Sequence, residues 1–139
     1  MIPISFASVL VAAIVAFIIG FLMHGPIAGK LWMRLANITP TGNEKFSDMY
    51  GQMFMNLLAN IVSAFILAAI YMFMSASGYA TPTPVVNGLI CGFLVWSGFI
   101  VTNTSMDVIW MGKSFKLWMF ETVSSLIVML AMGAIIALW

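Results

Sequence analysis

The chain has 139 residues, of which 63% are hydrophobic and only 6% are charged. Roughly a quarter of the residues of a soluble domain are charged, so this composition excludes an ordinary water-soluble protein and indicates a membrane protein. A net charge of +1 gives no basic surface for nucleic acid, and the single Cys91 excludes a disulfide within one chain.

Four stretches of the chain are long and apolar enough to cross a bilayer, which takes about 20 residues each. They are Ile4–Met23, Gln52–Met74, Val85–Met106 and Leu117–Trp139. We therefore expect residues 1–139 to form one all-α domain, an integral membrane four-helix bundle. The first stretch is predicted to be a retained helix and not a signal peptide. No Lys or Arg precedes Lys30, and no small-x-small cleavage site follows the apolar run.

The segment between the first two stretches predicts an additional short helix over residues 26–37. Pro26 suits the first position of a helix, and apolar residues recur after it at helical spacing. Lys30 and Arg34 fall together on another face, four residues apart. We expect this amphipathic helix to lie in the membrane interface, with Lys30, Trp32 and Arg34 at the lipid headgroups.

A polar motif follows the interfacial segment. Thr41-Gly-Asn-Glu44 has the form of a capping box, in which the first and fourth side chains satisfy backbone N–H groups at a helix start. This pattern predicts that the second long helix begins in water near Thr41 and enters the membrane near Gln52.

The distribution of cations predicts the orientation in the membrane. All five lie in the first and third connections, at Lys30, Arg34, Lys45, Lys113 and Lys116. Because cytoplasmic loops carry an excess of Lys and Arg, we expect both of these connections in the cytoplasm and both chain termini on the other side. The expected location is the cell's inner or plasma membrane.

Strongly polar side chains recur at one predicted depth, in the cytoplasmic half of the bundle. They are His24, Asn56, Asn60, Asn103, Asp107 and Glu121. One interpretation is a polar vestibule that binds or passes a small polar solute, an ion or a proton. The other is structural, since polar side chains commonly join membrane helices by hydrogen bonds.

Glu121 is the most demanding member of this set, because a carboxylate inside a bilayer is costly and normally faces a partner. We expect it to face the bundle interior and to be held by a partner from the first connection or the first helix. His24 and Arg34 are the favoured partners, since both are predicted at the same depth.

The sequence predicts no cofactor, no metal site and no enzymatic activity. One His and one distant Cys are a poor ligand set for zinc, copper or haem. Neither a nucleophile–base arrangement nor a nucleotide-binding fingerprint can be identified.

Small residues recur at four-residue spacing in the predicted spans. Gly88-x-x-x-Gly92 lies in the third and Gly133-x-x-x-Ala137 in the fourth. Such residues let helix backbones approach closely in a membrane. They indicate either packing within the bundle or a dimer face.

Several of these motifs resemble a prokaryotic membrane family known as domain of unknown function 1761. The segment Gly20–Met33, which reads G-F-L-M-H-G-P-I-A-G-K-L-W-M, is similar to its first signature. Trp96–Phe99, Gly112–Trp118 and Met132–Trp139 resemble its second half. Members usually carry an aromatic pair where Met23-His24 stands, and often a His near Ser124 or Ser125. The resemblance implies a fold and a location, and no established activity.

These observations leave three hypotheses for the function. The first is a transport or channel unit, formed by a homodimer around the polar residues, since one four-helix bundle has little room for a pore. The second is a non-catalytic accessory subunit of a larger membrane complex. The third, an enzyme acting on lipid with Glu121 or Asp107 as acid or base, has only the presence of carboxylates in its favour. Membrane lipid is the expected partner in each case.

Overall fold

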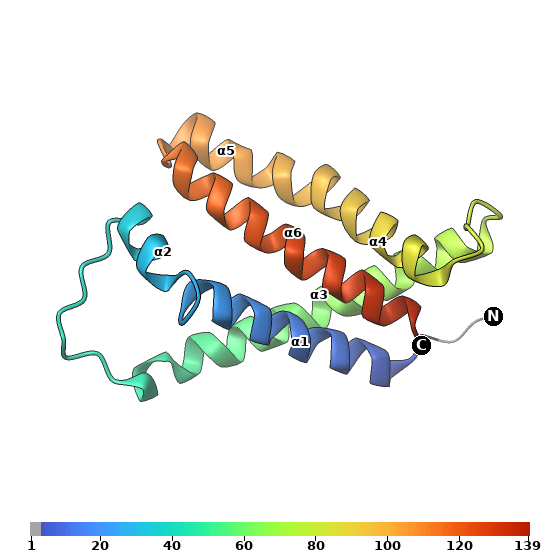
Figure 1. Cartoon of the computed structure of the whole chain (residues 1–139), viewed down its shortest axis with the longest axis horizontal. Coiled ribbons are helices and arrows are strands. Elements are labelled where there is room, and N and C mark those ends of the chain that lie inside the picture. The colour runs from blue at the N-terminus through green and yellow to red at the C-terminus, as the bar shows by residue number, and fades with distance from the viewer. Residues whose placement is uncertain (1–3) are drawn as a thin grey trace.

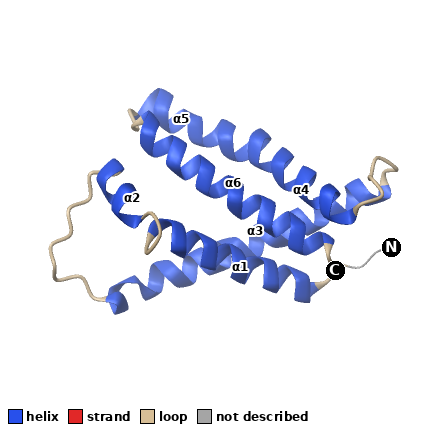
Figure 2. Cartoon of the chain, viewed as in Figure 1, coloured by secondary structure: helices blue, strands red, loops and turns tan. Residues whose placement is uncertain are grey.

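The computed structural model describes residues 4–139, and these residues form helices joined by short connections, with no strand among them (Figures 1 and 2). Four helical segments are long and apolar enough to cross a membrane, which confirms the predicted all-α membrane fold. They are α1 (Phe6–His24), η1 with α3 (Phe46–Met49 and Tyr50–Ala76), α4 with η2 and α5 (Pro84–Val95, Trp96–Val101 and Thr102–Met111), and α6 (Phe115–Ala137). The short α2 spans Gly29–Leu35.

Local chemistry explains where several of these helices begin and end. The Ser5 side chain accepts a hydrogen bond from the Ser8 N–H at 3.3 Å, which caps the start of α1. Pro84 occupies the first turn of α4, where its missing N–H costs no hydrogen bond. Gly112 ends α5 with φ +69°, a left-handed conformation that glycine adopts without strain. This residue turns the chain sharply into α6.

The short helix predicted over residues 26–37 is present but shorter, at Gly29–Leu35. Residues 25–28 form a tight turn, with the Ile27 N–H donating to the Leu22 carbonyl and the Gly29 N–H to the Gly25 carbonyl. The turn is so tight that a Cβ at position 29 would lie 2.9 Å from the His24 carbonyl oxygen. The chain therefore bends before the helix begins, and α2 turns away from the direction of α1 (Figure 1).

The predicted helix start at Thr41 is wrong. The Glu44 carboxylate does accept from the Thr41 N–H at 2.6 Å, but the Thr41 hydroxyl donates to the same carboxylate instead of capping an N–H. Gly42 adopts φ +80°, which is incompatible with the first turn of a helix. The motif closes a turn, and the helix begins later, at Phe46.

The two ends of the bundle are packed differently. We call the end where α1 begins and α6 ends the terminal end, and the end that holds α2 and the Gly112–Ser114 turn the charged end. The core lies from the middle of the bundle toward the terminal end. It consists of Val9, Ala12, Ala13, Ala16, Ala64, Leu67, Ala68, Cys91, Met132 and Ile136.

The closest helix crossing lies at the terminal end, between α4 and α6. A Cβ added to Gly88 would collide with the backbone carbonyl of Gly133, and one added to Gly92 would collide with that of Met129. The two backbones are therefore in direct contact. Of the two roles left open for these small residues, the structure gives them packing within the bundle.

The charged end is more open. Neither η2 nor α5 has a buried residue, and the buried residues of α3 all lie between Ala64 and Ala68, in its second half. Among the described residues α3 contacts α1, α4 and α6 but not α5. The start of α3 consequently diverges from α5 and α6 (Figure 1).

Candidate functional site

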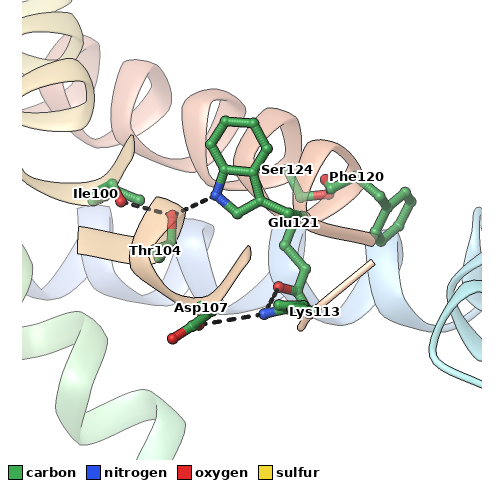
Figure 3. A network of polar contacts seen from close by, with 8 residues as sticks. Ile100, Thr104, Asp107, Lys113, Phe120, Glu121 and Ser124 are labelled. Atoms are coloured by element: carbon green, nitrogen blue, oxygen red, sulfur yellow. Dashed lines mark hydrogen bonds and ion pairs between the residues drawn. The ribbon is translucent and has the colours of Figure 1, made fainter. Parts of the chain in front are cut away.

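An ion-pair network crosses the charged end between α5, the following turn and α6. The Lys113 Nζ lies 2.5 Å from Oε2 of Glu121 and 3.7 Å from Oδ2 of Asp107. Figure 3 shows the ammonium between the two carboxylates. The tight turn after Gly112 places Lys113 there, and its backbone N–H donates to the Asp107 carbonyl at 3.1 Å. The Lys113 side chain is thus directed toward Glu121 on α6.

This network carries one more negative than positive charge and is reached by solvent. The exposed fractions of the side chains are 24% for Lys113, 33% for Glu121 and 49% for Asp107. The hydrogen bond from Lys113 to Glu121 is the main cause that raises the pKa of the lysine above its ordinary value of 10.5, and the two negative charges add to it. Lys113 therefore stays charged at physiological pH.

A second polar link supports the network from α6. The indole Nε1 of Trp118 donates to the Thr104 hydroxyl at 2.9 Å. That hydroxyl donates to the Ile100 carbonyl at 2.7 Å (Figure 3). Thr104 lies on α5 three residues before Asp107, on the same face of the helix. The link therefore fixes α5 against α6 beside the two carboxylates.

The π-helical segment η2 is joined to α6 by a third link. Trp96 donates from Nε1 to the Thr122 carbonyl at 2.9 Å and to the Ser125 hydroxyl at 3.2 Å. The Thr122 hydroxyl is itself buried and has no hydrogen-bond partner among the described residues. Short π-helical segments are frequent at functional sites. Here the segment marks the point where the closely packed α4 gives way to the open α5.

Glu121 has a cationic partner as predicted, but the partner is neither His24 nor Arg34. Lys113 reaches it because the turn before α6 brings two residues eight positions apart into contact. His24 instead shares a hydrogen bond with the Gly20 carbonyl at 2.9 Å through Nδ1. Its ring packs edge-on against Trp32 at 5.4 Å and Phe120 at 5.7 Å, so it joins α1 to α2 and α6.

The three predicted asparagines do not join this network. Asn60 donates from Nδ2 to the carbonyl of Asn56 at 3.0 Å and to its side-chain oxygen at 2.7 Å, so these two side chains are linked to each other along α3. Because α3 and α5 are not in contact, the pair stays apart from Asp107. Asn103 is exposed on α5. The polar residues that were predicted at one depth therefore lie on separate faces of the helices.

The sequence did not predict the residues that complete the network. Lys113 was predicted as a loop cation, and Trp96 and Trp118 were not predicted as hydrogen-bond donors. A signal for Lys113 existed, because a glycine suited to a left-handed turn precedes it and carboxylates stand on both sides of the turn. Within residues 4–139 no three side chains of His, Cys, Asp and Glu gather as a metal site.

Comparison with known proteins identifies a family for this chain. The family model described as "Protein of unknown function (DUF1761)" matches residues 7–137. The match covers nearly the whole chain, so the chain belongs to this family, as its motifs suggested. Neither a curated protein nor a solved structure matches it significantly.

Proposed function

We propose that this member of the DUF1761 family is a non-enzymatic membrane unit that binds a proton or a small monovalent cation at its charged end and passes it across the bilayer as a homodimer. One observation carries the proposal. Asp107 and Glu121 share the single ammonium of Lys113, which leaves an uncompensated negative charge that solvent reaches. Ionisable groups in membrane spans are costly and typically mark ion or proton pathways.

The chemistry of the network favours a singly charged ligand. Calcium takes six to eight oxygen ligands, whereas the two carboxylates here offer four oxygen atoms, two of which are already engaged by Lys113. A proton or a monovalent cation needs fewer ligands. Its arrival at Glu121 would weaken the Lys113 ion pair and leave the ammonium with Asp107. In this proposal Lys113 neutralises Glu121 until the ligand binds, and the ligand then takes its place at that carboxylate.

A second copy of the chain would complete the passage. The core toward the terminal end is closely packed, with Leu67 and Met132 among its fully buried side chains. A pocket of about 280 Å³ beside Ser8, Tyr71 and Ile136 opens beyond it. The packed core blocks a route through a single chain. Asn56 and Asn103 are exposed at membrane depth, where a polar side chain is best satisfied by another protein surface. A dimer that covers these side chains would place polar groups along its interface.

The orientation forms part of the proposal. The two connections that hold all the cations would lie in the cytoplasm, and the chain termini on the other side of the inner or plasma membrane. The network at the charged end would then load from the cytoplasm.

Flux through purified protein in liposomes tests this function. Proteoliposomes with an internal pH-sensitive or potassium-sensitive dye should show flux above that of empty vesicles. Glu121→Gln and Asp107→Asn should each lower the flux at least tenfold. Asp48→Asn is the matched control, because this carboxylate lies at the same end but caps the backbone N–H of Lys45. Flux equal to that of empty vesicles, or unaffected by Glu121→Gln, would refute the proposal.

The second candidate is an accessory subunit of a larger membrane complex. It is favoured by the packed core together with large exposed apolar side chains on α3, such as Phe54, Met55 and Phe73. Gentle extraction from native membranes separates the two functions. A symmetric dimer supports the transport unit, whereas a stoichiometric complex with other chains supports the accessory subunit.

A further inference from the structure

The cations at the charged end differ in whether they form ion pairs with carboxylates. Within residues 4–139 only Lys113 forms ion pairs with carboxylates. Lys30 and Arg34, both exposed on α2, have no such partner in the described part of the chain. Since they stand four residues apart on a helix, their side chains project from one face. The α2 face formed by Lys30 and Arg34 therefore carries two uncompensated positive charges.

The carboxylates that could neutralise this face are engaged elsewhere. Glu44 accepts hydrogen bonds from the Thr41 and Gly42 N–H groups, at 2.6 and 3.0 Å. Asp48 accepts from the Lys45 N–H at 3.3 Å. Asp107 and Glu121 are held by Lys113. These four are all the acidic residues of the chain. An anion for the α2 face must therefore come from outside the protein.

The α2 helix is held firmly beside the ends of the membrane spans. Gly29 is buried against the backbone of His24, and the Trp32 ring packs on the His24 ring, which packs in turn on Phe120 of α6. Apolar side chains next to the cations remain exposed, with Ile27 at 69% and Leu31 at 40%. A fixed cationic face bordered by exposed apolar groups is the arrangement typical of helices that lie in a lipid interface.

We infer that the α2 face is a docking site for the headgroup phosphate of anionic phospholipids. Charge complementarity identifies this partner. In a zwitterionic headgroup the lipid's own ammonium offsets the phosphate, whereas an anionic headgroup offers a net negative charge to both cations. Ile27 and Leu31 contact the acyl region of the same lipid, which a soluble phosphate ion lacks. The inference does not depend on the proposed transport function.

Lipid-dependent stabilisation in detergent tests this site. The protein in a neutral detergent is titrated with phosphatidylglycerol or phosphatidylcholine while thermal unfolding is followed. A basic residue near an anionic lipid surface contributes roughly a fivefold change in binding. The concentration of phosphatidylglycerol for half-maximal stabilisation should therefore rise roughly fivefold in Lys30→Gln or Arg34→Gln, and roughly 30-fold in the double variant.

A matched double variant separates a defined site from general electrostatics. Lys45→Gln with Lys116→Gln removes the same charge from two exposed residues at the same end, and its half-maximal concentration should change by less than about threefold. Equal losses in the two double variants would show diffuse attraction and overturn the site. Equal stabilisation of the wild type by phosphatidylcholine, or by inorganic phosphate at the same concentration, would overturn the lipid assignment. The single variants decide the matter if the double variant does not fold.

Discussion

The terminal end and the charged end of this bundle are held together by different chemistry. At the terminal end the backbones of α4 and α6 touch through Gly88 and Gly133, and small residues of α1 and α3 fill the core beside them. At the charged end α5 and α6 are joined by side-chain hydrogen bonds and the Lys113 ion pairs. Close contact of apolar surfaces fixes one end, whereas exchangeable polar contacts hold the other.

This difference has a physical consequence for motion. Membrane helices gain little from hydrophobic association, so close packing of small residues supplies much of the attraction between them. Interactions of that kind are lost together when the backbones separate. Exposed ion pairs and single hydrogen bonds can break and re-form individually, at a cost of about 1 kcal/mol each. The contacts between α5 and α6 at the charged end are therefore the part of the bundle able to rearrange when a ligand binds.

The largest expected effect comes from breaking the terminal end. Gly133→Ala places a Cβ against the backbone carbonyl of Gly88, which cannot move aside as a flexible side chain would. We expect α4 and α6 to separate and the free energy of unfolding to fall by about 1–3 kcal/mol, the usual range for overpacking, and toward its upper limit because backbone blocks the Cβ. Equilibrium unfolding with sodium dodecyl sulfate in mixed micelles measures the change.

A glycine with open surroundings provides the control. Apart from the neighbouring backbone of its own helix, no atom lies within 4 Å of a Cβ built on Gly20, in the second half of α1, so Gly20→Ala should leave stability unchanged or raise it by up to ~1 kcal/mol. If Gly133→Ala were as harmless as Gly20→Ala, the two ends could not differ in the way described above.

The next largest effect is expected where the two ends meet. Trp96→Phe keeps an aromatic ring, smaller than the indole, but removes the N–H that donates to the Thr122 carbonyl and the Ser125 hydroxyl. Loss of a buried hydrogen bond costs about 1 kcal/mol. Hydrogen–deuterium exchange should also rise in η2 and α5 while α4 keeps its protection. Uniform exchange along α4, η2 and α5 would mean that Trp96 does not separate the two regions.

The fold followed from the sequence because its physical causes are local or additive. Four long apolar stretches in a chain of 6% charge admit few structures other than spanning helices. The helix boundaries that were predicted wrongly depend on backbone conformation. With Gly42 at φ +80°, the predicted capping motif forms a closed turn instead. The tight bend before Gly29 makes the predicted interfacial helix shorter than expected. Glycine allows such conformations without showing which one is adopted.

The candidate site was predicted in composition but not in arrangement. Depth in the membrane can be estimated by counting residues along each helix, and this count gathered Asn56, Asn103 and Glu121 into one layer. The count says nothing about which faces meet. Whether α3 touches α5 depends on helix crossings that are set far away, at Gly88 and Gly133. The Lys113 partner of Glu121 likewise depended on a turn.

A smaller effect is expected from the ion pairs of the charged end. Because the Lys113 side chain is partly exposed, Lys113→Met should lower the free energy of unfolding by only about 0.5–1 kcal/mol. The pKa of Lys113 is raised in the folded protein, so its contribution is complete below the unfolded value near 10.5 and is lost as the pH rises through the folded pKa. Unfolding measured from pH 9 to 12 should show this alkaline loss in the wild type and not in Lys113→Met. Equal alkaline losses would assign the effect to another group.

The smallest expected effect concerns the turn beyond α2, the part of the charged end farthest from the packed core. Hydrogen bonds from the Thr41 and Gly42 N–H groups and the Thr41 hydroxyl lower the pKa of Glu44 from 4.5 to about 2. With the folded pKa below the unfolded value, the turn is most stable above pH 4.5 and loses this stabilisation as the pH falls toward 2.

Nuclear magnetic resonance can follow that loss at individual residues. The amide signals of Thr41 and Gly42 should titrate together with a midpoint near pH 2 and should not titrate in Glu44→Gln, while signals from the α4–α6 crossing stay unchanged. A midpoint near 4.5 would show that the carboxylate is not held by the turn. Movement of Gly88 or Gly133 signals with the same midpoint would show that the two ends are coupled. If neither occurs, acid opens this turn at the charged end while the backbone contact at the terminal end is retained, as the two kinds of packing require.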